Sequence, residues 1–531
     1  METLQNSYIY FVSDFILIFG VILSAFIGLH IKNLAPKWHL RLLNTILALM
    51  LLGFLPFLTG FLKLTNLDIF SNLVPFTDYN LTFLSGSVNI TPLNLFFKFL
   101  ITLCAFITSL LSFGFVKKLN RKISNFTSLF LISLLGGYGV CISNDFITLF
   151  LSVEILSVAL YFLIASFYNK KDKEKNSLEA SVKYFIINEV ASCFMLLGIS
   201  YIYLNLGTIN FSDINTIAIN KILPSTPLLN IGEILFFLAL TFKIGAFPFY
   251  IWLMDVFKGS NYSIGLFISS VIKTVGAAAL IKTGSSLGCF NSVLSFALIL
   301  CACITLVIGN LIAARIVKKE GDIKDFLASS SISNIGYVLL GIAFFTKSSI
   351  TASIFFLIVY LISNFGLWAA FMLVVRNLRK FILKSETSKY ETDYGAKKLY
   401  VDENLGAIKG VAYISPFFAT LVVICLLSFA GFPVMAGFTA KFYLFSNILR
   451  SGIFSVYPLL FAAFASILAV YYNFKIISFM FQKPDRLKIY KKKPVFNRVN
   501  IYIFILSMAA LLLIAGFFLS TPVINILNNF I

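Results

Sequence analysis

Long apolar segments recur along the whole 531-residue sequence, and they limit the folds that the chain can adopt. Many contain about 18 to 25 residues, enough for a helix to cross the hydrocarbon core of a bilayer. Inside lipid every backbone polar group must be paired within the protein, so only helices and closed barrels can span a membrane. The segments are too long to be barrel strands, and 59% of all residues are hydrophobic. The sequence therefore predicts an all-α, polytopic membrane protein.

Hydropathy and charge together indicate about fourteen membrane-spanning helices. They are expected at residues 7–30, 42–63, 92–116, 125–142, 146–168, 180–205, 231–253, 262–281, 291–314, 326–346, 351–375, 412–445 (interrupted), 453–481 and 499–521.

The net charge of +20 comes from basic residues that gather in alternate loops. The loops that follow odd-numbered helices hold about three quarters of the 42 lysines and arginines, which is the positive-inside pattern. We therefore expect these loops in the cytoplasm and both termini on the outer side of the cell membrane. This distribution also argues against a nucleic-acid-binding surface, because the basic residues form no single patch on a soluble domain.

Two expected helices, the seventh and the twelfth, are interrupted by glycine and proline beside a lysine. The interrupting residues are Gly245 and Pro248 in the seventh helix and Gly431, Pro433 and Gly437 in the twelfth, next to Lys243 and Lys441. Helices five apart cross the membrane in opposite directions, so the pattern favours two inverted five-helix repeats, helices 4–8 and 9–13. An ordinary proline kink at each place is the alternative.

The domain organisation follows from this pattern. We expect three N-terminal helices in 1–124, a first repeat in 125–285, a second repeat in 286–482 with a cytoplasmic loop at 376–410, and a basic loop with a last helix in 483–531.

Five of the charged side chains inside expected helices are candidates for a functional role: Glu154, Glu189, Lys243, Lys273 and Lys441. Each costs about 2.5 to 3.5 kcal/mol near the middle of a membrane on insertion scales, so each should face the bundle interior and have a partner. Glu189 lies nearer a helix end, where it is either an interface anchor or a functional acid. Lys98 and Lys475 also lie near helix ends, and we expect both to extend toward the membrane surface.

Glu154 and Lys243 form the natural pair because they have opposite charge and similar depth. Burial disfavours the charged form of each group, whereas the opposite charge of the partner favours it. A pair balanced in this way changes protonation when the partners move slightly, which a permanently charged arginine would not do. A static salt bridge that holds two helices together is the alternative.

Motifs for cofactors and metals are lacking in the sequence. It contains no glycine-rich dinucleotide fingerprint after a strand, no phosphate-binding loop sequence and no HExxH. The seven cysteines show no CxxC spacing and are expected to be small buried apolar residues. We therefore expect neither a metal site nor a cofactor site on this chain.

Several of these segments resemble the subunit N family of NADH-quinone oxidoreductase, respiratory complex I, one of its antiporter-like membrane subunits. The resemblance covers residues from about 92 to 482 and rests on "NLFFKFLITL", "SNDFITLFLSVEILSVALYFLIA", "SLEASVKYFIINEVAS", "KIGAFPFYIWLMDVF", "GNLIAAR", "SSSISNIGY", "LSFAGFPVMAGFTAKFYLF" and "YYNFKIISFMF", which occur in the family's order.

The resemblance assigns roles to four of the buried charges. It implies a glutamate–lysine pair at Glu154 and Lys243, a further lysine at Lys273 and a last one at Lys441 in the second broken helix. Lysine at the last position is similar to subunit N, since the related subunit M has glutamate there. Antiporter-like subunits of sodium/proton (Mrp-type) antiporters and of membrane-bound hydrogenases share much of the pattern and are the close alternative.

The sequence departs from the family at two positions where histidine is common, Tyr250 and Asn334. A proton relay near Asn334 would then run through water or through hydroxyl groups such as Ser331 and Ser333.

The resemblance implies a proton-translocating subunit, part of a translocase whose redox chemistry takes place on other chains. NAD, FMN, iron–sulfur clusters and quinone are expected on partner subunits, namely the peripheral redox arm and the other membrane subunits. The expected location is the cell inner membrane, with the lipid bilayer as surroundings and no nucleic-acid partner. An independent cation/proton antiporter and a structural scaffold with unused charges are the competing hypotheses.

Overall fold

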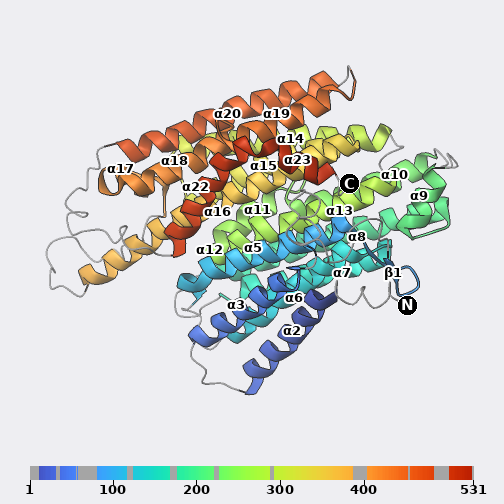
Figure 1. The fold of residues 1–531 in the computed structure, drawn as a ribbon, viewed down its shortest axis with the longest axis horizontal. Helices are drawn as coiled ribbons and strands as arrows, with labels where there is room; N and C mark the ends of the chain where they lie inside the picture. Colours follow the sequence, from blue (N-terminus) through green and yellow to red (C-terminus); the bar gives the residue numbers. More distant parts are fainter. Residues whose placement is uncertain are drawn as a thin grey trace, which may run out of the picture. The chain divides into compact units, whose positions relative to one another are not determined.

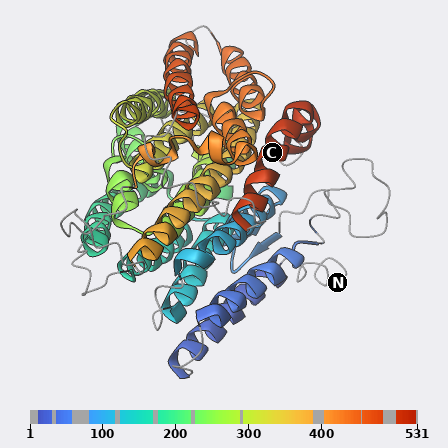
Figure 2. The same ribbon diagram turned by 90° about the vertical axis from the view of Figure 1, so that its left-hand side faces the viewer.

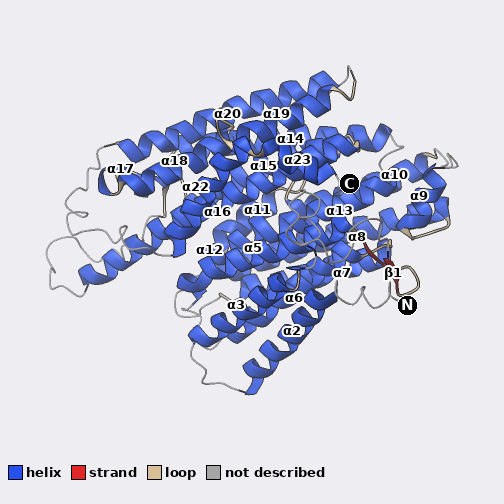
Figure 3. Cartoon of the chain, viewed as in Figure 1, coloured by secondary structure: helices blue, strands red, loops and turns tan. Residues whose placement is uncertain are grey.

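The computed structural model describes residues 11–30, 36–55, 57, 81–116, 123–167, 176–219, 226–287, 292–386, 403–452, 455–482 and 501–528. Over these residues the chain is almost entirely helical, with one short antiparallel hairpin of strands β1 and β2 (Figure 3). The hairpin, Leu81–Phe83 with Val88–Ile90, precedes the helix that begins at Pro92.

The first half of the described chain contains α2 (Val12–His30), α3 (Pro36–Leu52), α5 (Pro92–Val116), α6 (Ile123–Ile142), α7 (Phe146–Ala165), α8 (Asn176–Leu206), α9 (Phe211–Ile219), α10 (Pro227–Ile244), α11 (Ile251–Gly259), α12 (Tyr262–Phe267), the π-helix η5 (Ile268–Ile272) and α13 (Lys273–Leu287). The second half contains α14 (Ser292–Lys318), α15 (Ile323–Ile342), α16 (Lys347–Glu386), the 3₁₀-helix η7 (Leu405–Ile408), α17 (Val411–Ile414), α18 (Pro416–Ala430), α19 (Ala436–Leu449), α20 (Val456–Phe481), α22 (Ile501–Phe518) and α23 (Ser520–Asn528).

Ten helical stretches among the described residues are long and apolar enough to cross a membrane. They are Pro92–Val116, Ile123–Ile142, Phe146–Ala165, Ser177–Leu206, Pro227–Ile244, Tyr262–Leu287, Ser292–Lys318, Lys347–Asn377, Val456–Phe481 and Ile501–Phe518. Shorter apolar helices include Val12–Gly28 and Pro416–Ala430. The protein is therefore a multi-pass helical membrane protein, and the total of fourteen helices stays a prediction.

The chain divides into two compact units. The first unit consists of Met1–Thr305, Ile335–Ile354 and Pro522–Ile531. In it α8 packs against α7, α10 and α11, while α5 packs against α3, α6, α12, η5 and α13 (Figure 1). The neighbouring helices α2 and α3, in dark blue, run side by side in Figure 2.

The second unit consists of Leu306–Asn334 and Phe355–Thr521. Its helix α18 packs against α17, α19, α20 and α22, so the interrupted segment α18–α19 lies inside a bundle of its own unit.

Both interrupted segments end their first helix at a glycine in the left-handed conformation. Gly245 follows α10 with a φ of 71°, and Gly431 follows α18 with a φ of 80°. Side chains with a Cβ rarely adopt this conformation, which explains the choice of glycine at each helix end. Pro248 and Pro433 lie between the two helical parts, before α11 and α19 begin.

Residues 376–386 belong to α16, so the prediction of a loop starting at 376 is wrong for this part. The segment contains several lysine, arginine and leucine residues, which favour helices, and it contains neither glycine nor proline. The helix therefore continues through it despite its charge. Residues 387–402 of the predicted loop lie outside the described residues.

Five of the seven cysteines are buried as expected: Cys104, Cys141, Cys301, Cys303 and Cys425. Cys193 is exposed on α8, which corrects the prediction for this residue, because α8 presents one apolar face to its surroundings. Cys289 lies outside the described residues.

Replacing Gly437 by alanine should destabilise the second unit. A Cβ at this position would overlap the backbone carbonyl oxygen of Ser428, where α19 crosses the end of α18. Backbone atoms cannot move aside as a side-chain end can, so we expect a loss of about 1 to 3 kcal/mol and a lower midpoint of thermal unfolding in detergent.

Gly321→Ala is the matched control in the same unit, since its added Cβ would come no closer than 3.2 Å to any atom, the Cγ2 of Ile316, and no closer than 3.4 Å to a backbone atom. Equal unfolding midpoints for the two variants would show that the contact of Gly437 with Ser428 does not limit stability.

Candidate functional site

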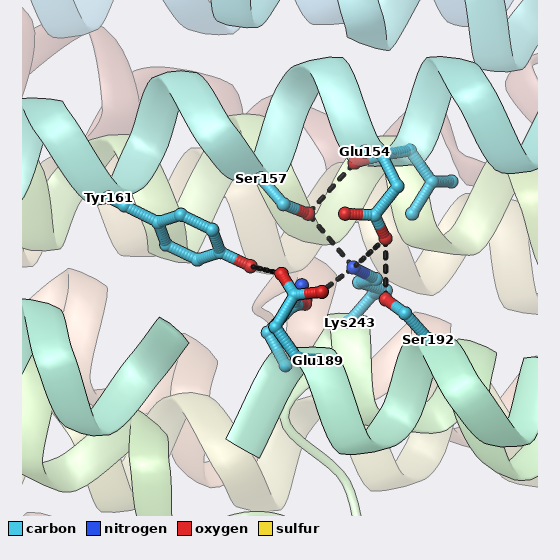
Figure 4. Close-up of polar contacts among 8 residues, drawn as sticks. Glu154, Ser157, Tyr161, Glu189, Ser192 and Lys243 are labelled. Carbon is cyan, nitrogen blue, oxygen red and sulfur yellow. Dashed lines mark hydrogen bonds and ion pairs between the residues drawn. The ribbon is translucent and has the colours of Figure 1, made fainter. Parts of the chain in front are cut away.

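The side chains of Glu154 and Lys243 meet inside the first unit (Figure 4). Glu154 lies in the middle of α7 and Lys243 at the end of α10, and the distance from Lys243 Nζ to Glu154 Oε1 is 3.8 Å. This is an ion pair without a direct hydrogen bond, because hydrogen bonds to a carboxylate are about 1 Å shorter. The lysine side chain is 5% exposed and the glutamate side chain 20%.

Helix caps set the positions of both side chains. The Asp145 side chain accepts a hydrogen bond from the Thr148 backbone N–H and begins α7. Thr226 caps α10 in the same way, and Pro227 occupies the first turn, where a missing N–H costs nothing. Lys243 lies in the last turn of α10, where the negative end of the helix dipole favours a cation.

The ammonium group of Lys243 has two closer partners that the sequence analysis did not identify. It donates hydrogen bonds to Ser157 Oγ at 2.8 Å and to Asn188 Oδ1 at 2.5 Å. Ser157 follows Glu154 by three residues, so the two share a face of α7. This spacing could have identified Ser157 from the sequence. No pattern in the sequence singled out Asn188, because only the packing of α8 against α7 brings it to this place.

The carboxylate of Glu154 also accepts a hydrogen bond from Ser192 Oγ on α8. One turn earlier on α8, Glu189 accepts a hydrogen bond of 3.3 Å from the Tyr161 hydroxyl and acts electrostatically on Lys243. Glu189 is therefore next to the pair, within the same group of polar side chains between α7 and α8 (Figure 4). The site thus contains two carboxylates and one ammonium group, surrounded by hydroxyl groups.

Lys273 is the first residue of α13 and follows the π-helix η5 directly. Lys273 is 1% exposed. The apolar stretch of the surrounding segment Tyr262–Leu287 is also buried inside the protein. A π-helical turn inside a membrane helix changes the hydrogen-bond spacing of the backbone, and such turns are frequent at functional sites.

Lys441 lies in the second unit, in the first part of α19, and is 6% exposed. Its ammonium group donates to the carbonyl oxygens of Ala430 at 3.1 Å and Phe429 at 3.4 Å. These are the last carbonyls of α18, which the interruption leaves without helical partners. Gly431 makes room for this contact, because a Cβ there would lie 2.9 Å from Lys441 Cδ.

A small cavity borders Lys441, and its size is close to the lower limit for holding one water molecule. Among its lining residues are Asn334, Tyr360, Ser363 and Ser428. The Tyr360 hydroxyl is hydrogen-bonded to Ser331 at 2.8 Å. The predicted accessory residues Asn334 and Ser331 are thus beside or one hydrogen bond away from this cavity.

Ser333 and Tyr250 are placed differently from these two. Ser333 donates to the Ser330 backbone carbonyl and is buried in α15. Tyr250 is half-buried at the residue before α11, after Pro248, and belongs to the first unit.

Lys98 does not extend toward the membrane surface as predicted. Its side chain is fully buried in α5 and forms an ion pair with Asp14 of α2. The prediction failed because hydropathy along one helix does not show which polar side chain a distant helix supplies. Lys475 of α20 is half-buried, and its expected extension toward the surface stays a prediction.

Within the described ranges, no three histidine, cysteine, aspartate or glutamate side chains lie close enough together to hold a metal ion.

Comparisons with known proteins place these features in a family. The family model described as "NADH:quinone oxidoreductase/Mrp antiporter, TM" matches residues 143–470. The NADH-quinone oxidoreductase subunit N of Cytophaga hutchinsonii is 32% identical over 394 residues, which cover 74% of this chain and 77% of that protein.

Two solved structures have a similar fold. A chain in respiratory complex I from Thermus thermophilus with bound aureothin is 23% identical, with a TM-score of 0.70 over 97% of this chain and 98% of that one. A chain of the membrane-bound sulfane sulfur reductase, an archaeal respiratory membrane complex, is 22% identical, with a TM-score of 0.77 over 97% and 96%.

A double-mutant cycle should detect the interaction between Glu154 and Lys243. We expect Glu154→Gln and Lys243→Met to lose less stability together than the sum of the single changes, by about 1 kcal/mol, because each single change leaves one buried charge without its partner. Thermal unfolding of the four proteins in detergent measures this difference. A coupling energy of zero would contradict the interaction, and the exposed pair Glu179 and Lys183 on α8 serves as the control cycle.

Proposed function

The chain belongs to the NADH:quinone oxidoreductase/Mrp antiporter family, and we propose that it carries protons across the membrane through its buried glutamate and lysine side chains. It is a proton-translocating, antiporter-like membrane subunit N of an NADH-quinone oxidoreductase. Its partners are the other membrane subunits of that complex and the peripheral arm. NAD, FMN, iron–sulfur clusters and quinone would then bind to those partners.

The observation that carries the proton path is the buried group around Lys243. A lysine can exist as an ammonium ion or as a neutral amine, and the balance depends on how close an anion lies. At 3.8 Å, Glu154 attracts the ammonium group without a direct hydrogen bond, so a shift of either helix changes the interaction appreciably. Ser157 and Asn188 offer acceptors that hold the ammonium form in place.

From this site, protons would pass to Lys273 and then to Lys441. Lys273 follows a π-helix whose altered backbone spacing supports a functional role, and Lys441 contacts carbonyl oxygens freed by the interruption after α18. The final step would use the cavity beside Lys441. A single water molecule there could exchange a proton with Lys441, and the hydroxyl groups of Tyr360 and Ser331 continue the path beside Asn334.

The two interrupted segments support the arrangement as inverted five-helix repeats. In each, a helix ends at a left-handed glycine, a proline follows and a second helix begins within seven residues. We place the repeats at helices 4–8 and 9–13, in residues 125–285 and 286–482. The basic loops that follow odd-numbered helices would lie in the cytoplasm, and the complex would lie in the inner membrane of the cell.

Glu154→Gln and Lys243→Met should each lower proton pumping by the assembled complex. A positioned proton-transfer group commonly speeds its own step by about 100-fold or more. Without the group that step slows, and we expect the pumping rate of the whole complex to fall by about half or more. The measurement is NADH-driven acidification of inverted membrane vesicles, normalised to the amount of assembled complex.

Lys183→Met is the control, because this lysine of α8 is half exposed and belongs to a surface ion pair. Pumping at the original rate in both Glu154→Gln and Lys243→Met would rule out the proposed path. Sodium-for-proton exchange by the chain purified without redox subunits would instead support the antiporter alternative.

The final step of the proposed path, at the cavity beside Lys441, can be tested separately. Tyr360→Phe removes only the hydroxyl group that contacts Ser331, and we expect slower pumping with unchanged assembly. Tyr337→Phe is the comparison variant and should pump normally, because this buried tyrosine lies on α15, whereas Tyr360 lies on α16. If Tyr360→Phe pumps as fast as the original protein, water alone completes the path from Lys441.

A further inference from the structure

A second buried acid–lysine pair lies in the first unit, formed by Asp14 of α2 and Lys98 of α5. The lysine side chain is 0% exposed and the aspartate side chain 16%. The pair resembles the one of Glu154 and Lys243, in which the lysine is also the more deeply buried member. A charge pair buried among apolar helices seldom gains stability over a well-packed apolar pair, so its presence needs another explanation.

The surroundings of this pair are polar on the side facing α6 and α13. Lys98 Nζ lies 4.9 Å from the centre of the Tyr138 ring, and the Tyr138 hydroxyl is hydrogen-bonded to Thr102. Lys282 of α13 donates to the Cys141 carbonyl oxygen at 2.8 Å, and Cys141 lies one turn after Tyr138 on α6. These groups therefore gather at one end of the bundle, where α2 and α5 begin and α6 and α13 end.

A row of buried hydroxyl groups continues along α5 from this pair toward Lys273. Thr102 and Thr108 are both 0% exposed, and Thr108 lies 3.4 Å from Ser270 Oγ of the π-helix η5. Between them lies the buried thiol group of Cys104. Helix α5 thus presents polar side chains to η5 and α13 over more than one turn inside an apolar bundle.

We propose that Asp14 and Lys98 form a second proton-exchange site, which connects Lys273 with the membrane surface at which α2 and α5 begin. The charge distribution of the loops places this surface on the outer side of the membrane. The inference rests on the proposed function, since it adds a branch to the same proton path. Neither residue belongs to the group around Lys243.

The proton transfer at this site conserves charge. The Lys98 ammonium group gives a proton to the Asp14 carboxylate, which leaves a neutral amine and a neutral carboxylic acid. Asp14, the more exposed of the two, then releases the proton to water at the surface. The amine of Lys98 takes up the next proton from the row of hydroxyl groups and water along α5, which restores the ion pair.

Lys98→Arg tests this role in the assembled complex. Arginine keeps the positive charge and the ion pair with Asp14 but does not release its proton. We therefore expect NADH-driven acidification of inverted vesicles to fall at least about two-fold, with assembly of the complex unchanged. If the pair only ties α2 to α5, Lys98→Arg will pump as the original protein does, and the proposal is wrong.

Tyr138→Phe provides a second test in case Lys98→Arg fails to assemble. It removes one hydroxyl group beside the pair and keeps the ring, so a merely structural role predicts normal pumping and the proton-exchange role predicts slower pumping. Lys409→Arg is the matched control, because Lys409 forms a comparable ion pair with Glu320 at 2.6 Å but is one-third exposed.

The variants Glu154→Gln and Lys243→Met measured in parallel separate the two proposals. Slower pumping in those variants with normal pumping in Lys98→Arg and Tyr138→Phe overturns only the second site. Normal pumping in Glu154→Gln and Lys243→Met overturns the proposed function itself.

Discussion

The energetic cost of a lysine ammonium group among apolar helices governs the local structure at each buried lysine. In this environment an ammonium group needs acceptors or an anion, because no water is at hand to solvate it. The protein meets this need in two ways. Lys243 obtains Glu154, Ser157 and Asn188 from two other helices, whereas Lys441 obtains backbone carbonyls from a helix end.

The helix interruptions are the second half of this solution. Ending α18 at Gly431 frees carbonyl oxygens in the interior of the bundle, and these oxygens are good acceptors for a cation. The same interruption makes the helix end movable relative to α19, since no continuous backbone ladder joins them. A lysine held by such carbonyls is therefore sensitive to the conformation of the break, which suits a site whose protonation must change during a cycle.

Sequence reasoning located the chemically important residues but not their neighbours. Glu154 and Lys243 stand out because a charge inside an apolar helix is rare, and their depth and opposite sign suggest a pair. Asn188 and Ser192 carry no such signal, because small polar residues are common in membrane helices. Lys98 was misplaced for the opposite reason: its partner Asp14 lies 84 residues earlier, on a helix that no local pattern connects with α5. The helical end of the predicted 376–410 loop differs from the prediction because α16 continues to Glu386, beyond the apolar segment that hydropathy detects.

The sequence by itself determined that the chain is a multi-pass helical protein, where most of its helices run and that Lys243, Lys273 and Lys441 are buried in them. These properties follow from one-dimensional quantities, namely the length of apolar segments and the positions of charge, glycine and proline. The tertiary structure alone decided which side chains meet: the 3.8 Å between Glu154 and Lys243, the carbonyls around Lys441 and the pair of Asp14 and Lys98. Such contacts depend on the rotation and packing of helices distant in sequence, and the hydropathy of a single helix contains no information about them.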